Sequence, residues 1–243
     1  MPEIDDGAAQ IVVASPPFTY QRDSKSLDKK EYLNFLRRVF RECLRVLIPG
    51  GTLSTINTDL RDHARYNGGD KRFDGLLWQK HCAIRQMAES VGFRCVEAKI
   101  WAKSLNRNVY RYNFSYVQFF RKRTTTAQDS LRGGVTKEFG PDVWLLENGT
   151  LRRDLRGRMF RDAVHPEVVR RCLEQFSSRG DLVVSPFTGS GTIVSIARLM
   201  GRRCVGYETD KSLKSLIRET IEAPERFSAF LDLPCIAASR KAP

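Results

Sequence analysis

The sequence predicts an α/β fold in which helices cover both faces of a mostly parallel central sheet. Residues 11–14 form a continuous apolar run, as in a strand that is buried on both faces. Further along the chain, strand-like runs alternate with segments whose apolar residues recur at helical spacing. With 243 residues, the chain is long enough to form one such domain over 1–243.

In the first half of the chain, a strand at 11–14 is followed by a polar loop at 19–30 and a helix over 32–47. The sequence Pro-Gly-Gly at 49–51 is expected to stop this helix. The remaining elements expected here are a strand at 52–57, a polar segment at 58–75, a helix at 76–93, a strand at 94–103 and an alternating, aromatic-rich strand at 108–122.

Residues 123–160 are polar and weakly periodic, which predicts a long loop or a small insertion. A helix over 165–177 follows, with Pro166 near its start. The next elements are a strand at 181–187, a glycine turn, a helix at 192–200, a strand at 203–208 and a helix at 210–221. The tail at 223–243 is expected to be partly ordered at best.

The net charge of +13 and the isoelectric point near 9.7 favour a polyanionic partner over an inert basic surface. No run of about 18 apolar residues is present, so no membrane span is expected. The acidic N-terminus differs from a secretory signal, which predicts an intracellular protein. The basic charge predicts that it is located with nucleic acid. Six scattered cysteines and three histidines predict no metal site, and the cysteines are expected to be reduced and mostly in the core.

A glycine turn separates a strand from a helix in LVVSPFTGSGTIVSIA (182–197). Gly189 and Gly191 allow a tight turn and close backbone approach to a ligand. A phosphate-binding loop would need a lysine after the last glycine, and a dinucleotide fingerprint a third glycine where Val194 stands. S-adenosylmethionine remains as the candidate ligand of the glycine turn. Glu208, at the end of the next strand, would hold its ribose hydroxyls. A tight connection beside a solvated strand end is the alternative.

The first strand ends in Ser15-Pro16-Pro17-Phe18. Proline fixes φ and has no N–H, so this turn is expected to be rigid and to leave the Pro16 carbonyl uncommitted. The oxygens of Ser15 and Pro16 would accept the hydrogens of an exocyclic amine, while Phe18 stacks on its ring. The amine would then be oriented toward an electrophilic methyl group. A plain strand-terminating turn is the alternative.

Together these stretches resemble the amino-methylating DNA methyltransferases, S-adenosylmethionine-dependent enzymes that modify cytosine N4 or adenine N6. The motif at 15–18 matches their catalytic motif, and 165–192 resembles their cofactor segment. Shorter matches lie at 45–53 and 114–122. The order of catalytic motif before cofactor motif is that of the permuted β group. The resemblance implies a Rossmann-like S-adenosylmethionine-dependent methyltransferase fold with a circularly permuted motif order.

The resemblance also implies which residues form the site. Ser15, Pro16, Pro17 and Phe18 would hold a base flipped out of the duplex. The residues implied to line the cofactor are Pro186, Phe187, Thr188, Gly189, Ser190, Gly191, Thr192, Glu208 and His165. For His165, a solvent-facing position at a helix N-terminus is equally compatible with the sequence.

Double-stranded DNA is the implied partner, and 123–160 stands where the family often reads DNA sequence. Basic residues flank or lie within this segment, and they are expected to contact phosphates unless they form a solvated charge run. They are Arg121, Lys122, Arg123, Arg152, Arg153, Arg156, Arg158 and Arg161. The aromatic residues at 110–120 are expected to belong to the core and the sheet face.

Serine at the first motif position is typical of cytosine-N4 enzymes, which favours cytosine over adenine. RNA as the substrate, or an inactive nucleic-acid-binding module on the same fold, are the further alternatives. Ser185 stands where the family usually has aspartate, which would weaken cofactor binding. The family normally has an additional strand and hairpin upstream of the first strand predicted here. We therefore expect either that the tail completes the sheet or that an edge strand is left for a partner, including a second copy in a homodimer.

Overall fold

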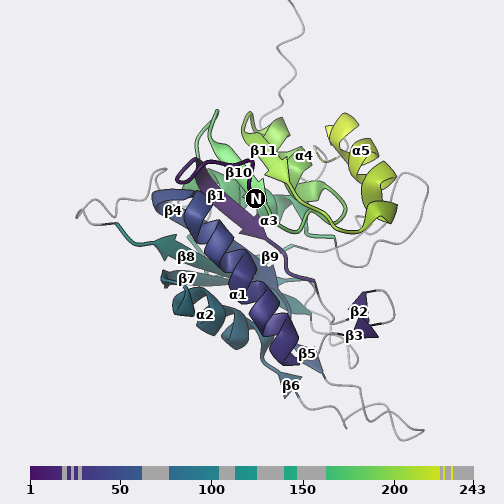
Figure 1. Cartoon of the computed structure of the whole chain (residues 1–243). Coiled ribbons are helices and arrows are strands. Elements are labelled where there is room, and N and C mark those ends of the chain that lie inside the picture. Colours follow the sequence, from purple (N-terminus) through teal and green to yellow (C-terminus); the bar gives the residue numbers. More distant parts are fainter. Residues whose placement is uncertain are drawn as a thin grey trace, which may run out of the picture.

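The computed structural model describes residues 1–17, 21–22, 25–26, 29–61, 77–103, 113–124, 140–146, 163–224, 227 and 231. At its centre lies a seven-stranded sheet, flanked by helices on both faces (Figure 1). The strands are ordered β11 (Arg203–Gly206), β10 (Leu182–Ser185), β1 (Ala9–Ala14), β4 (Leu47–Asn57), β8 (Phe114–Lys122), β7 (Phe93–Ala102) and β9 (Val143–Leu145). Only β8 is antiparallel to its neighbours, which confirms the predicted fold class.

The helices are α1 (Lys29–Val46), α2 (Lys80–Ser90), α3 (Pro166–Phe176), α4 (Thr192–Leu199) and α5 (Lys214–Glu222), with a 3-10 turn, η3, at Lys211–Leu213. Two small antiparallel pairs lie outside the sheet, formed by β2 (Gln21–Arg22) with β3 (Lys25–Ser26) and by β5 (Leu60–Arg61) with β6 (Leu77–Trp78). The predicted helices and sheet strands are therefore present, with shifted ends. These short strands and β9 were not predicted.

The continuous apolar run of β1 is explained by burial on both faces of the sheet. Ile11 and Val13 face the cluster that contains the apolar residues of α3 and α4. Val12 and Ala14 face the opposite cluster, which contains those of α1 and α2. Because successive strand residues point to opposite faces, a strand between two helical layers needs apolar residues at every position.

The helix before β4 ends without the predicted glycine stop. α1 ends at Val46 and β4 begins at the next residue, so Pro-Gly-Gly lies within the strand. A Cβ on Gly51 would lie only 3.0 Å from the Ile48 carbonyl oxygen and 3.1 Å from that of Gln10. The pairing with β1 also shifts register here, so these glycines permit a strand irregularity where two backbones approach closely.

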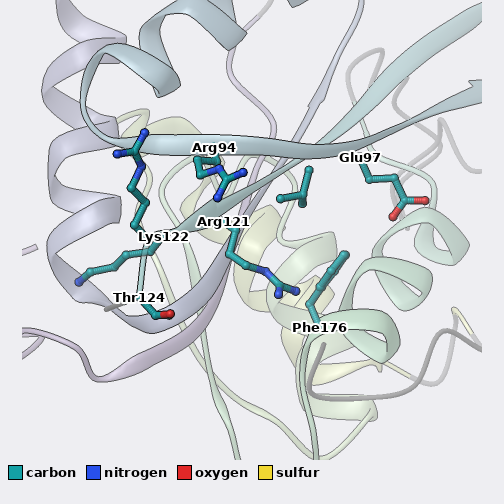
Figure 2. A pocket seen from close by; sticks show the side chains of 8 residues that line it. Arg94, Glu97, Arg121, Lys122, Thr124 and Phe176 are labelled. Atoms are coloured by element: carbon teal, nitrogen blue, oxygen red, sulfur yellow. The ribbon is translucent and has the colours of Figure 1, made fainter. Parts of the chain in front are cut away.

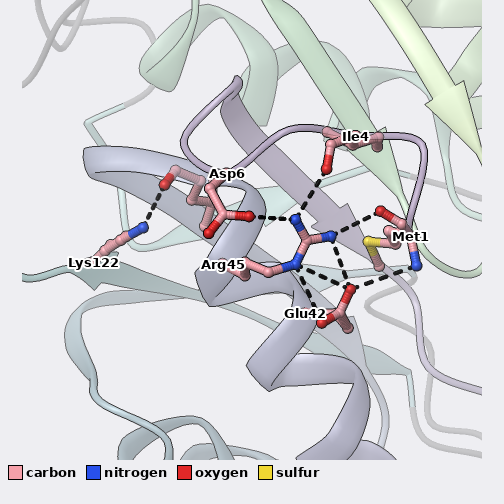
Figure 3. A network of polar contacts seen from close by, with 7 residues as sticks. Met1, Ile4, Asp6, Glu42, Arg45 and Lys122 are labelled. Atoms are coloured by element: carbon pink, nitrogen blue, oxygen red, sulfur yellow. Dashed lines mark hydrogen bonds and ion pairs between the residues drawn. The ribbon is translucent and has the colours of Figure 1, made fainter.

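The N-terminal segment is held against the end of α1 by one guanidinium group (Figure 3). Arg45 Nη1 donates to the Ile4 carbonyl at 3.0 Å and to Asp6 at 2.6 Å, and Nη2 donates to the Met1 carbonyl at 2.8 Å. Arg45 also binds Glu42, and this hydrogen bond lowers the pKa of the Glu42 carboxyl. The segment that precedes β1 is thus fixed in place.

The two outermost strands of the sheet are β11 and β9. In β9, Trp144 is buried, whereas Val143 and Leu145 are exposed. The described tail residues 223, 224, 227 and 231 form no sheet strand, although Phe227 and Leu231 pack into the core. Within the described part of the chain, the tail therefore does not complete the sheet. Most of 123–160 and of 223–243 lies outside the described residues.

The expectations about membranes, metals and cysteines are tested only over the described ranges. No helix there is both long and apolar enough to cross a membrane. No group of three metal-binding side chains occurs in this part of the chain. Five cysteines are described, all free, but only Cys43 and Cys172 are buried. The other three are half-buried, but Cys95 and Cys204 pack against the core, so the prediction of cysteines mostly in the core is confirmed for four of the five described and was wrong for Cys82.

Candidate active site

Two segments far apart in sequence meet at one edge of the sheet. β1 and β10 are parallel neighbours, with Ile11 beside Val183 and Val12 beside Val184. The turn that follows β1, residues 15–17, and the turn that follows β10, residues 186–191, therefore leave the sheet on the same side. We call this side of the sheet, at the carboxyl ends of the parallel strands, the catalytic edge. Phe18 lies outside the described residues.

The glycine turn has the backbone conformation that its sequence predicts. Gly189 and Gly191 both have positive φ, at 56° and 89°. Gly191 is the N-cap of α4, and its N–H donates to the Thr188 carbonyl at 3.0 Å. A Cβ on Gly191 would lie 3.3 Å from the Thr220 side chain, so a larger residue is disfavoured by both φ and space.

Glu208 lies beside this turn because β11 is parallel to β10, with Gly206 paired to Ser185. One carboxylate oxygen of Glu208 accepts from the Gly189 N–H at 2.8 Å. The other accepts from the Asp210 N–H at 2.9 Å. Two backbone donors thus fix the orientation of the carboxylate at the catalytic edge, next to the glycine turn.

The residues around the turn fit S-adenosylmethionine. The Ser185 hydroxyl is fully buried at the end of β10 and has no hydrogen-bond partner within the described ranges, so a ligand donor would satisfy it. The hydroxyls of Ser190 and Thr192 lie 3.0 Å apart in the turn. The half-buried ring of Phe187 packs 6.1 Å from Phe35 of α1, between centroids. Polar, apolar and carboxylate groups therefore converge where the ligand was expected.

The Ser-Pro-Pro turn makes contacts that the sequence did not predict. Lys80 Nζ donates to the Pro17 carbonyl at 2.7 Å and to the Pro16 carbonyl at 3.2 Å. The Tyr32 hydroxyl donates to the Pro17 carbonyl at 3.1 Å. The expectation that the Pro16 carbonyl is uncommitted was wrong. Lys80 was missed because a lysine in a predicted amphipathic helix reads as solvent-facing, yet its residue is fully buried.

An aspartate–histidine pair stands at the end of β4, which is the other neighbour of β1. His81 Nδ1 lies 2.7 Å from an Asp59 carboxylate oxygen, which also accepts from the His81 backbone N–H at 3.1 Å. The imidazole stacks on Tyr116 of β8, with ring centroids 3.8 Å apart. These contacts anchor the start of α2 at the catalytic edge.

His165 is buried at the N-terminus of α3, so the solvent-facing alternative was wrong. The residue is 6 % exposed, and its Nδ1 accepts from the Glu167 N–H at 3.1 Å. Its ring packs edge-on against Trp101, near the end of β7, with centroids 6.1 Å apart. Since Nδ1 is an acceptor, a neutral imidazole carries its proton on Nε2. Contact with the cofactor stays a prediction.

The basic residues at the end of β8 lie away from this site. Because β8 is antiparallel to β4, Tyr116 pairs with Asn57 near the catalytic edge, whereas Arg121 lies near the opposite edge. There, Lys122 donates to the Leu47 carbonyl at 2.6 Å. Figure 2 shows the pocket at this end, about 590 Å³ in volume and lined by Arg94, Val96, Glu97, Arg121, Lys122, Arg123, Thr124 and Phe176.

This placement does not support contact between Arg121, Lys122 or Arg123 and DNA that is bound at the catalytic edge. The remaining predicted DNA contacts lie outside the described residues: Arg152, Arg153, Arg156, Arg158 and Arg161. The aromatic prediction for 110–120 is confirmed for Phe119 and Phe120, which are fully buried.

The chain is similar to known methyltransferases over nearly its full length. It is 30% identical over 273 residues to the Type II methyltransferase M.MjaI of Methanocaldococcus jannaschii, covering 91% of this chain and 88% of M.MjaI. It is 32% identical over 245 residues to the orphan methyltransferase M.BamHII of Bacillus amyloliquefaciens, covering 90% of this chain and 91% of M.BamHII.

Solved structures share the fold. A putative DNA modification methylase of Thermus thermophilus, TTHA0409, was solved in complex with S-adenosyl-L-methionine. It superposes with a TM-score of 0.71 at 25% identity, covering 92% of this chain and 89% of TTHA0409. The cytosine-N4-specific PvuII DNA methyltransferase superposes with a TM-score of 0.69 over 94% of this chain and 86% of its own, and its 16% identity supports the fold alone.

Residues 9–219 match the family model N6_N4_Mtase, described as DNA methylase. The matched span contains both turns of the catalytic edge, and S-adenosylmethionine is the cofactor of this class. The chain belongs to the DNA methylase family of S-adenosylmethionine-dependent methyltransferases that act on amino groups of bases.

Proposed function

We propose that the protein transfers a methyl group from S-adenosylmethionine to the exocyclic N4 of a cytosine that is flipped out of double-stranded DNA. The observation that carries this proposal is the meeting of the Ser-Pro-Pro turn and the glycine turn at one edge of the sheet. An amine held by the first turn would face a cofactor bound by the second. Proximity and orientation of this kind supply much of the rate in a direct displacement.

Each turn has a separate task in this proposal. The hydroxyl of Ser15 and the carbonyl of Pro16 accept hydrogens of the target amine and orient its nitrogen lone pair. A carbonyl oxygen has two lone pairs, so the Pro16 carbonyl can hold the amine while Lys80 occupies its other side. The glycine turn and Glu208 hold S-adenosylmethionine, which when bound supplies an electrophilic methyl group on a sulfonium.

Cytosine is favoured over adenine because serine at the first motif position is typical of the cytosine-N4 enzymes that the sequence resembles. A hydroxyl accepts from the amine without the charge of a carboxylate, which suits orientation rather than proton removal. Phe18 would stack on the flipped ring, and stacking of this kind contributes roughly 1–3 kcal/mol, which offsets part of the cost of unpairing.

Methyl transfer to unmethylated bulk DNA from a methylation-deficient bacterial strain tests the proposal. After incubation with labelled S-adenosylmethionine, the DNA is digested and its nucleosides are separated by mass spectrometry. We expect N4-methylcytosine, which is lost in Ser15→Ala and Phe18→Ala but kept in Ser90→Ala, whose hydroxyl is exposed at the end of α2.

Each other outcome identifies an alternative. N6-methyladenine would assign the adenine-N6 activity, and label in an RNA control alone would assign RNA as the substrate. DNA binding without methyl transfer or S-adenosylmethionine binding would indicate an inactive binding module. Full activity in both Ser15→Ala and Phe18→Ala would contradict the assignment of the site.

A further inference from the structure

We propose that Lys80 is a positioning residue for methyl transfer, whose ammonium group holds the carbonyls of Pro16 and Pro17 and so orients the Pro16 carbonyl toward the target amine. The inference rests on the proposed function, because that function assigns the Pro16 carbonyl a role in binding the amine. It adds a third chain segment, the N-terminus of α2, to the two turns that meet at the catalytic edge.

The contacts of Lys80 are directed at the backbone of the Ser-Pro-Pro turn. Its Nζ lies 2.7 Å from the Pro17 carbonyl oxygen and 3.2 Å from that of Pro16. The lysine is fully buried, and its ammonium lies 5.6 Å from the ring centroid of Tyr32. The Tyr32 hydroxyl donates to the same Pro17 carbonyl at 3.1 Å. One carbonyl of the turn is therefore held by two donors from two helices.

The chemistry of the turn explains why an ammonium is useful there. Neither proline has an N–H, so the turn cannot be tied to the protein through backbone donors at these two positions. Its carbonyls are then the groups that neighbouring elements can hold. Hydrogen bonds from a charged donor are stronger than those from a neutral one. A buried ammonium is costly without such partners, so a hydrophobic residue would be the simpler choice if Lys80 only filled space.

The helix that carries Lys80 is anchored at the same edge. The neighbouring His81 is bound to Asp59 through both its backbone N–H and its ring Nδ1. The His81 ring stacks on Tyr116 of β8. Lys80 therefore extends from a helix start that is fixed to the end of β4 and to the beginning of β8. Its ammonium can therefore hold the Ser-Pro-Pro turn from a fixed position.

Lys80→Met is the test, because methionine is apolar and of similar length but cannot donate. Lys99→Met is the control for the loss of a buried lysine, since Lys99 is also buried and donates to the Gly140 carbonyl and to Asp142, away from the turn. We measure single-turnover methylation of bulk DNA, binding of S-adenosylmethionine and thermal unfolding. We expect Lys80→Met to lower the single-turnover rate by roughly 10- to 100-fold, with cofactor affinity within about twofold. Lys99→Met keeps the rate within about twofold.

A double-mutant cycle separates positioning from general destabilisation. Tyr32→Phe removes the second donor to the Pro17 carbonyl, so its effect on the rate should be larger when Lys80 is present than in Lys80→Met. Non-additivity between residues that share a partner is expected, whereas independent losses of stability would add. Additive effects on the rate would contradict the shared role.

Two further outcomes overturn the inference. The first is that the wild type methylates DNA and the Lys80→Met variant does so at the same single-turnover rate. The second is independent of activity: crystal structures in which the Pro16 and Pro17 carbonyls keep their positions in Lys80→Met. A wild type that methylates neither cytosine nor adenine would instead contradict the proposed function, and the crystallographic comparison would still decide whether Lys80 positions the turn.

Discussion

Replacing Glu208 by glutamine tests whether its carboxylate binds the cofactor ribose. The carboxylate accepts from the Gly189 N–H at 2.8 Å and from the Asp210 N–H at 2.9 Å. Glutamine keeps one acceptor oxygen but places an NH₂ group where the second oxygen stood. The variant therefore loses the negative charge and one backbone hydrogen bond, while the size of the side chain is unchanged.

The expected loss of cofactor affinity follows from one hydrogen bond, which a ribose hydroxyl of S-adenosylmethionine would donate to the charged carboxylate of Glu208. Such a bond contributes roughly 1.5–3 kcal/mol, and about 1.4 kcal/mol corresponds to tenfold in affinity. We therefore expect Glu208→Gln to bind S-adenosylmethionine roughly 10- to 100-fold more weakly, as measured by calorimetric titration. DNA binding without cofactor should change little, because Glu208 serves the glycine turn.

Asp181→Asn is the control for Glu208→Gln. Asp181 also accepts from a backbone N–H, that of Ser178 at 2.8 Å, but it lies just before β10, at the opposite edge of the sheet. Both variants should lower thermal stability, and only Glu208→Gln should weaken cofactor binding. An affinity within twofold of wild type in Glu208→Gln would refute the ribose assignment.

Three further predictions concern reactivity, pH and salt. Burial raises the pKa of the Cys172 thiol to about 12 from 9.0, so alkylation of Cys172 at pH 8 should require denaturant, as read by mass spectrometry; rapid native labelling would contradict this. Arg45 lowers the pKa of Glu42 below 4.5, so the stability that Glu42→Gln loses at pH 7 should vanish as the pH falls through that lowered pKa; urea titrations that show a constant difference would count against it. DNA affinity should fall steeply with salt, given the net charge of +13, and a flat response between low and physiological salt would exclude phosphate contacts as its source.

The convergence of the two turns could be predicted because the signals are local. A buried strand that ends in Ser-Pro-Pro, and another that runs through a glycine turn into a helix, each reveal an element and its direction. Parallel strands place their carboxyl ends on one edge, so the meeting of 15–17 with 186–191 follows from the fold class. The pairing of β10 with β11 in the structure then places Glu208 beside Gly189.

Lys80 and β9 depend on contacts that local sequence does not encode. The partners of Lys80 are backbone carbonyls more than sixty positions away, and a carbonyl leaves no trace in the identity of its residue. β9 has three residues, and its pairing is with β7, which is distant in sequence. A strand of three residues is too short to show a hydrophobic period, and a contact with a distant backbone carbonyl produces no burial pattern in the local sequence.

The direction of β8 was the signal that could have placed Arg121 and Lys122. The predicted strand at 108–122 follows the strand at 94–103 after only a short connection. Two strands joined in this way are expected to be antiparallel, since a parallel pair needs a crossover of a dozen or more residues. The end of the second strand then lies at the start of the first, away from the catalytic edge, as the pairing of Arg94 with Arg121 shows.

Ser185→Ala distinguishes a ligand-facing hydroxyl from a structural one, because the two roles predict opposite effects. The Ser185 hydroxyl is fully buried, and its oxygen has no hydrogen-bond partner in the part of the chain that the structure describes. A buried polar group without a partner is unfavourable, so alanine should leave thermal stability without cofactor unchanged or raise it. If the hydroxyl binds S-adenosylmethionine, alanine should weaken that binding by roughly 2- to 10-fold, since a neutral hydrogen bond contributes about 0.5–1.5 kcal/mol. Lower stability with unchanged cofactor affinity would show that Ser185 serves the fold instead.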